Sequence, residues 1–135
     1  MSAYIFFKLT LEHKKPHYRK YVIDEFYNMV WRWSPNSDLE EAYNLTAFCA
    51  LDDTRIDWRY NRFHEQLGFC ITCGFKTIEV EGLQSILEKN IQLQREKRIR
   101  NKSYKDAKIR LKAIRKIFEE ANQEYDELYR LGFNV

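Results

Sequence analysis

A pair of cysteines with two residues between them is the first arrangement in this chain with recognisable chemistry. Cys70-Ile-Thr-Cys73 has the spacing of a zinc knuckle or of a redox pair. A structural zinc site needs four ligands, and Cys49 and His64 are candidates for the other two. However, the chain has no second cysteine pair at knuckle spacing, and the residues around the first pair are apolar, which favours buried and inert thiols. We therefore expect no metal site and no cofactor.

An arginine and a histidine are the second candidate group. They stand at the two ends of Arg59-Tyr-Asn-Arg-Phe-His64. This Arg-x4-His spacing resembles the catalytic signature of HEPN ribonucleases, a helical and often dimeric family. The resemblance covers these six residues and implies RNA cleavage by Arg59 and His64. The alternative is a surface helix on which the arginines are solvated, and our leading prediction contains no catalytic residues.

Three aspartates, Asp52, Asp53 and Asp57, lie close together in the sequence. Neighbouring carboxylates can bind a divalent metal ion or take part in acid–base chemistry. A helix predicted to begin near Thr54 offers a simpler role, since Asp and Thr are common N-caps and acidic residues are favoured in a first turn. We expect helix capping here.

The positive charge of the chain is concentrated in one segment. Residues 83–116 contain twelve Lys or Arg and three acidic residues, a net charge of +9, whereas the other 101 residues have a net charge of −6. A segment this basic in an otherwise acidic chain predicts a surface that binds a polyanion or an acidic partner. Its cations also come before the acidic residues of the last predicted helix, which is the reverse of what the helix dipole favours. A local rule broken without structural gain points to function.

Two long helices are predicted to carry this charge. The first runs from Leu83 to about Asn101, and the second runs from Ser103 to about Leu131, with Ser103 and Asp106 at capping-box spacing. The short break between them predicts an antiparallel pair, a basic helical hairpin over residues 83–131. The second helix has apolar residues at heptad spacing, which is typical of packing against another helix. These residues are Tyr104, Ala107, Leu111, Ile114, Phe118, Ala121, Tyr125 and Leu128.

From this surface we predict non-catalytic binding of nucleic acid, or of an acidic surface on a nucleic-acid-handling protein. The contacts are expected to go to phosphates, because no sequence-reading motif is present. The alternatives are a small inhibitor or adaptor protein, of the size that phages and mobile elements encode, a small HEPN-like ribonuclease, and a basic face that is merely solvated. The predicted binding residues are Arg95, Arg98, Arg100, Lys102, Lys105, Lys108, Lys112 and Arg115.

The rest of the chain predicts a small sheet and further helices. Tyr4–Leu11 is rich in β-forming residues, and Phe69–Val80 resembles a hairpin that turns at Cys73-Gly74. Apolar spacing and capping signals predict helices over residues 17–33, 37–50 and 54–67. The predicted fold class is α+β: one domain over residues 1–135, in which a small antiparallel sheet packs with several helices and the C-terminal helical hairpin.

The composition limits the broad class of protein. It is 44% hydrophobic and 16% aromatic, which is enough for a core and argues against intrinsic disorder. No run approaches the roughly 20 apolar residues that a membrane span needs, and the first apolar stretch is expected to be a strand and not a signal peptide. The three cysteines are an odd number. We expect a soluble, cytoplasmic protein with reduced thiols that is a monomer or a homodimer.

Overall fold

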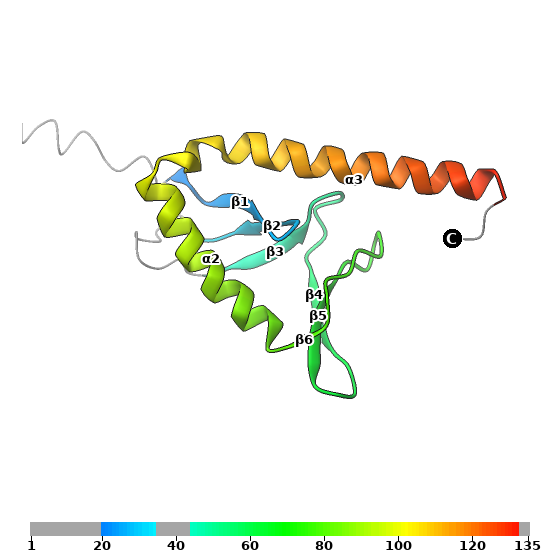
Figure 1. The fold of residues 1–135 in the computed structure, drawn as a ribbon, viewed down its shortest axis with the longest axis horizontal. Coiled ribbons are helices and arrows are strands. Elements are labelled where there is room, and N and C mark those ends of the chain that lie inside the picture. The colour runs from blue at the N-terminus through cyan, green and yellow to red at the C-terminus, as the bar shows by residue number, and fades with distance from the viewer. Residues whose placement is uncertain (1–19, 35–43, 133–135) are drawn as a thin grey trace, which may run out of the picture.

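The described residues form two small antiparallel sheets and two long helices (Figure 1). The computed structural model describes residues 20–34 and 44–132. The first sheet, in the order β1-β2-β3, consists of Ile23–Phe26, Met29–Arg32 and Thr46–Cys49. The second sheet, in the order β4-β5-β6, consists of Asp57–Tyr60, Glu65–Phe69 and Val80–Glu81. The helices are α2 (Leu83–Arg100) and α3 (Ala107–Arg130), joined through the 3-10 turn η2 (Ser103–Asp106). The fold class is α+β, as predicted.

The first segment that was predicted to be helical forms a β-hairpin with a tight turn. Tyr27 and Asn28 have φ angles of 56° and 64°, and positive values at both central positions are typical of the type I′ turn that joins two antiparallel strands. The central strand β2 is buried at three successive positions, residues 29–31, so it lacks the alternation of a half-buried strand. A short run of this kind cannot be told from a buried helix by its periodicity. The predicted helix over 17–33 is therefore wrong for residues 23–32.

The predicted helix over residues 54–67 is also a β-hairpin, formed by β4 and β5. The Asn61 side chain closes its turn by accepting hydrogen bonds from the backbone N–H groups of Phe63 and Glu65. Because β4 is mostly exposed, no alternation of apolar residues identifies it as a strand. The helix predicted over 37–50 is likewise wrong at its described end, where the chain forms β3.

The N-terminal strand predicted at Tyr4–Leu11 lies outside the described residues. The turn predicted in Phe69–Val80 is present, since Gly74 has a φ of 82° and its N–H donates to the carbonyl of Cys70. Beyond the turn, the chain meets β5 at one isolated bridge, between Phe69 and Lys76, and then as the short strand β6.

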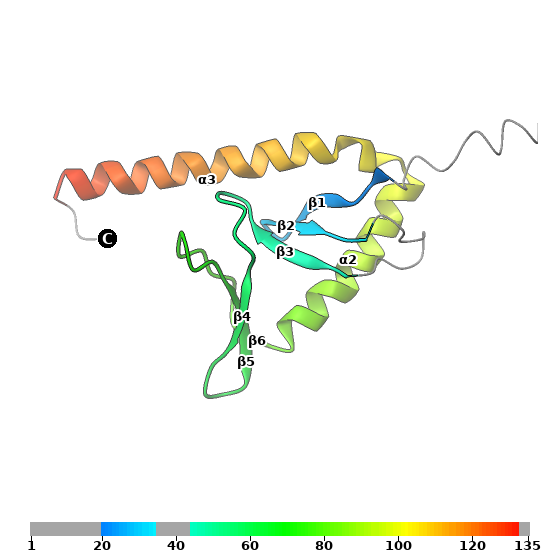
Figure 2. The same ribbon diagram turned by 180° about the vertical axis from the view of Figure 1, so that it is seen from behind.

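The helices begin and end close to the predicted boundaries, but they have different neighbours. The heptad spacing predicts that α3 packs along α2. Instead the two helices diverge from η2, and the first sheet lies between them, as both views show (Figures 1 and 2). Their main strand contacts also differ, because α3 contacts β1 while α2 contacts β5. Within the described part of the chain, neither helix has the length and apolar character needed to cross a membrane.

The two faces of the first sheet explain why the helices separate. Met29 and Trp31 belong to a core cluster with Leu87 and Ile91 of α2. Val30, which points to the other face, belongs to a second cluster with Ile114 of α3. The heptad residues of α3 therefore pack on the sheet, as far as Phe118. The first six residues of α3 beyond it, residues 119–124, are exposed.

Candidate nucleic-acid interface

A fully buried carboxylate ties both helices to the first sheet. Asp24 of β1 is 0% exposed and accepts a hydrogen bond of 2.6 Å from the hydroxyl of Tyr21. Arg98 of α2 lies 2.9 Å from the same carboxylate, and Arg110 of α3 contacts both of its oxygens, at 2.9 and 2.6 Å. Burial and the Asp24 charge raise the pKa of Tyr21 above its ordinary value, and the hydrogen bonds to Asp24 raise the pKa of Arg110. Tyr21, Arg98 and Arg110 thus stabilise the buried carboxylate of Asp24.

Two of the predicted binding residues therefore lie inside the fold. Arg95 is 1% exposed, and its guanidinium lies 5.6 Å from the ring centroid of Trp33. Arg98 donates to the carbonyl of Glu25 at 2.9 Å and covers the ring of Phe26 at 4.1 Å, in addition to its ion pair. The composition suggests that these arginines are surface charges, but in the structure Arg95 is buried and Arg98 is half-buried, and both pack against aromatic rings.

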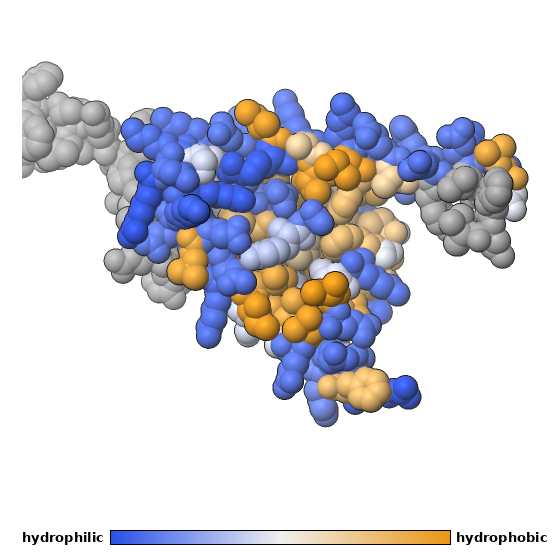
Figure 3. Space-filling model, in the orientation of Figure 1, coloured by the Kyte–Doolittle hydropathy of each residue, from blue (hydrophilic) through white to orange (hydrophobic). Residues whose placement is uncertain are grey.

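The other predicted binding residues are exposed, and they lie between the end of α2 and the third turn of α3. We name the four lysines of η2 and the first turns of α3 the lysine ridge: Lys102, Lys105, Lys108 and Lys112. Among the described residues, no carboxylate oxygen lies within 4.0 Å of any of these four ammonium groups. Arg100, which pairs with Glu96, lies at one end of the ridge, and Arg115 lies at the other. Hydrophilic side chains cover most of the surface where α2, η2 and α3 meet (Figure 3).

One lysine of the ridge, Lys108, is placed against the dipole of α3, although Asp106 directly precedes this helix. The first turn of this helix contains no acidic residue, although the free N–H groups at a helix N-terminus favour anions. Lys108 stands in that turn, and a cation there costs about 0.3–1 kcal/mol at low salt. Asp24 accounts for Arg98 and Arg110, but it does not account for the ridge. An external anion would remove the mutual repulsion of these lysines.

A groove of about 200 Å³ runs beside the C-terminal end of the ridge, between α3 and the first sheet. Arg32 of β2 and Arg115 of α3 contribute its charged edges together with Lys112, while Ile23 and Leu111 contribute apolar surface. Asp53 also lines the groove and forms an exposed ion pair of 3.0 Å with Arg32. Arg32 was not among the predicted binding residues, because its strand was predicted to be helical.

The Arg-x4-His group is not on a helix. Arg59 lies in β4 and pairs with Asp57 at 2.8 Å, whereas His64 lies in the exposed turn before β5. The helical context implied by the resemblance to HEPN ribonucleases is therefore absent at these two residues.

The three aspartates do not cap a helix either, because the described residues that follow them form the strands β4 and β5. Asp52 accepts a hydrogen bond of 3.0 Å from the N–H of Thr54, while Asp53 and Asp57 form ion pairs with arginines. Their side chains thus serve three separate contacts and form no shared acidic site.

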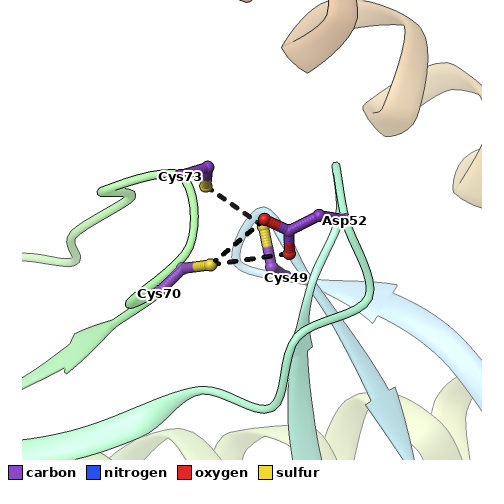
Figure 4. A group of neighbouring side chains, drawn as sticks. All are labelled: Cys49, Asp52, Cys70 and Cys73. Atoms are coloured by element: carbon purple, nitrogen blue, oxygen red, sulfur yellow. Dashed lines mark hydrogen bonds between the residues drawn. The ribbon is translucent and has the colours of Figure 1, made fainter.

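The three cysteines converge from distant parts of the chain (Figure 4). Cys49 is the last residue of β3, and Cys70 directly follows β5. The Sγ atoms of Cys49 and Cys73 are 3.4 Å apart, and the Sγ of Cys70 lies 3.5 Å from each carboxylate oxygen of Asp52. His64, the ligand considered from the sequence, stands at the opposite end of β5 and does not belong to the cluster.

The surroundings of this cluster shift its pKa values in two directions. Burial raises the pKa of the Cys49 thiol to about 12. Partial desolvation beside the other cysteines raises the pKa of Cys73 as well, although the residue as a whole is exposed. Burial alone would raise the pKa of Asp52 as well, but hydrogen bonds from Thr54 and the cysteines outweigh it and lower that pKa. These shifts favour the protonated forms of Cys49 and Cys73 and the ionised form of Asp52.

Comparison of the chain with protein-family models, with curated proteins and with solved structures finds no match. Its function is therefore inferred from its own residues.

Proposed function

We propose that this protein binds the phosphate backbone of nucleic acid through the lysine ridge, with Arg100 and Arg115 at its two ends, and that it does so without catalysis. One observation supports this best. Four exposed lysines follow one another over residues 102–112, around the N-terminal end of α3, and among the described residues no carboxylate oxygen lies within 4.0 Å of their ammonium groups.

The spacing of the cations suits a run of phosphates. Lys108 and Lys112 are one helical turn apart, about 6 Å along the axis, and Lys108 to Arg115 spans about 10 Å. Each strand of a duplex has one phosphate per roughly 3.4 Å of axis, so this length faces about three phosphates of one strand. Contacts from ammonium groups to phosphates carry no sequence information, so binding should depend little on sequence.

The test is binding of a fluorescent 20-base-pair duplex of arbitrary sequence, followed by anisotropy over a range of salt concentrations. If four lysines each neutralise one phosphate, log affinity falls against log salt with a slope of about −3.6 on duplex and about −2.8 on single strands. A second duplex of unrelated sequence should bind equally well. Absence of binding to either form at about 0.05 M salt rejects the proposal.

An acidic protein surface is the second candidate, and two exposed apolar side chains favour it. Ile109 and Ile117 of α3 are 67% and 57% exposed, and phosphate contacts make no use of them. A protein partner would bury them beside paired charges. A pull-down before and after nuclease treatment distinguishes the two functions, since only a protein partner is retained after nuclease.

A further inference from the structure

Two turns that face each other have the same backbone hydrogen bonds. In the first turn, the N–H of Cys49 donates to the carbonyl of Thr54 at 2.7 Å, and the carbonyl of Cys49 accepts from the N–H of Asp53 at 3.0 Å. In the second turn, Cys70 makes the same two bonds, at 2.9 Å each, with the residues five and four positions further on. The fifth residue of each turn has positive φ, 63° at Asp53 and 82° at Gly74.

Each turn also carries a metal-ligand residue at its first and fourth positions. These residues are Cys49 and Asp52 in the first turn and Cys70 and Cys73 in the second. The second turn has the Cys-x2-Cys spacing of a zinc knuckle, and the first repeats it with a carboxylate in the fourth position. No metal was expected from the sequence because the chain has no second pair of cysteines at this spacing, and the carboxylate at the fourth position of the first turn conceals the repeat.

The distances match one tetrahedral ion. One ligand atom from each of the four residues lies within 4.8 Å of the other three. Zn–S bonds of about 2.3 Å place two tetrahedral sulfur ligands about 3.8 Å apart. The observed Sγ separation of 3.4 Å between Cys49 and Cys73, and the 3.5 Å between Cys70 and the Asp52 oxygens, are close to these values. In Figure 4 all four side chains point toward a common space.

We propose that Cys49, Asp52, Cys70 and Cys73 bind a single Zn²⁺ ion as four tetrahedral ligands. Thiolates select zinc over the hard cations magnesium and calcium, which prefer oxygen ligands. Each thiol that binds releases its proton to the solvent, so the site gains the dication and loses three protons. Four protein ligands leave no position for a substrate, and such closed sites are structural.

The position of the site defines its role. Cys49 ends a strand of the first sheet, and Cys70 follows a strand of the second sheet. The ion would therefore join the two sheets at the end where the Phe75 ring meets Phe118 of α3, 5.4 Å between centroids. A metal at this point orders the turn that supports α3, and with it the helix that carries the lysine ridge.

The experiment uses the untagged full chain, purified from zinc-supplemented cells without chelator, and measures metal by elemental analysis. We expect one zinc per chain. Reduced, metal-free protein should also take up Co²⁺ and show the visible absorption of tetrahedral thiolate coordination, which zinc then displaces. Chelator should lower the midpoint of thermal unfolding, because an ion bound only by the folded state stabilises it.

Substitutions identify the ligands without depending on the core. Cys73 is exposed, so Cys73→Ala should fold and yet lose the zinc. Asp52→Asn should weaken zinc retention against a chelator, whereas the matched variant Asp53→Asn should not. Asp52→Cys completes four thiolates and should retain zinc at least as well as the wild-type chain. If Asp52 had only a structural role, Asp52→Cys should retain zinc less well than the wild-type chain, because the variant loses the carboxylate that accepts the hydrogen bond from the N–H of Thr54.

Several results overturn the proposal. These are a wild-type protein that neither contains zinc nor takes up Co²⁺, iron in place of zinc, and zinc that persists unchanged in Cys73→Ala. A disulfide between Cys49 and Cys73 in protein alkylated at lysis would also overturn it, and would show that their proximity serves redox chemistry.

Discussion

Neutralising the centre of the lysine ridge tests the proposed function most directly. The variant Lys105→Gln, Lys108→Gln, Lys112→Gln removes three positive charges from η2 and α3. All three side chains are exposed, and glutamine keeps the helix propensity close to that of lysine, so the fold should persist. A control with the same net charge, Arg62→Gln, Lys76→Gln, Lys89→Gln, removes exposed cations from other parts of the surface.

The expected magnitude follows from counterion release. Each phosphate contact on duplex DNA contributes about 0.9 to the slope, so three lost contacts reduce its size from about 3.6 to about 0.9. At about 0.15 M salt each contact is worth roughly a fivefold change in affinity, so the triple variant should bind about 100-fold more weakly. That loss corresponds to about 3 kcal/mol.

The assay is fluorescence anisotropy with the same duplex, at four salt concentrations between about 0.05 and 0.3 M. Thermal unfolding of both variants checks that each is folded. The reasoning fails if the folded ridge variant keeps the wild-type slope, or if the control variant loses as much affinity. In the second case binding follows net charge and uses no defined surface.

Three further predictions concern the frame that holds the ridge. Ile114→Ala should lower the free energy of unfolding by about 2–5 kcal/mol, because this side chain is only 7% exposed. The control Ile117→Ala, at a side chain that is 57% exposed, should change the free energy of unfolding by less than about 0.5 kcal/mol. Equal denaturation midpoints for the two variants would show that α3 does not pack on the sheet. Asp24→Ala leaves the two arginines that meet this carboxylate without their partner and should cost about 3–5 kcal/mol in urea unfolding, and a loss below about 1 kcal/mol would contradict the network. Tyr21→Phe should be less stable than wild type by an amount that is constant below about pH 10 and shrinks above that pH. Above about pH 10 the unfolded wild-type chain releases the phenolic proton, whereas the raised pKa of Tyr21 keeps that proton bound in the folded state. Urea unfolding of both proteins from about pH 8 to about pH 11 tests this, and a stability difference that does not change with pH refutes it.

Features that depend on local order along the chain could be predicted from the amino-acid sequence. The spacing of apolar residues predicted α3, because its helical periodicity persists over many turns, and the bounds of α2 were predicted to within one residue. The charge of residues 83–116 and the turn at Cys73-Gly74 were also visible, since they depend on composition or on neighbouring residues. These features need no knowledge of what the segment contacts.

Only the tertiary structure decided which partners these elements meet. The strands are four or five residues long, apart from the shorter β6, so each offers too few positions to establish a period of two. The strand β2 is also buried at successive positions, so its pattern does not differ from that of a short buried helix. The carboxylate of Asp24 forms ion pairs with Arg98 and Arg110, which lie 74 and 86 positions further along the chain. Two side chains that the composition suggests are free surface charges are therefore partly buried. Asp52 joins three cysteines only because two sheets place their turns face to face. Contacts between distant segments are set by the free energy of the whole fold, and no local spacing in the chain encodes them.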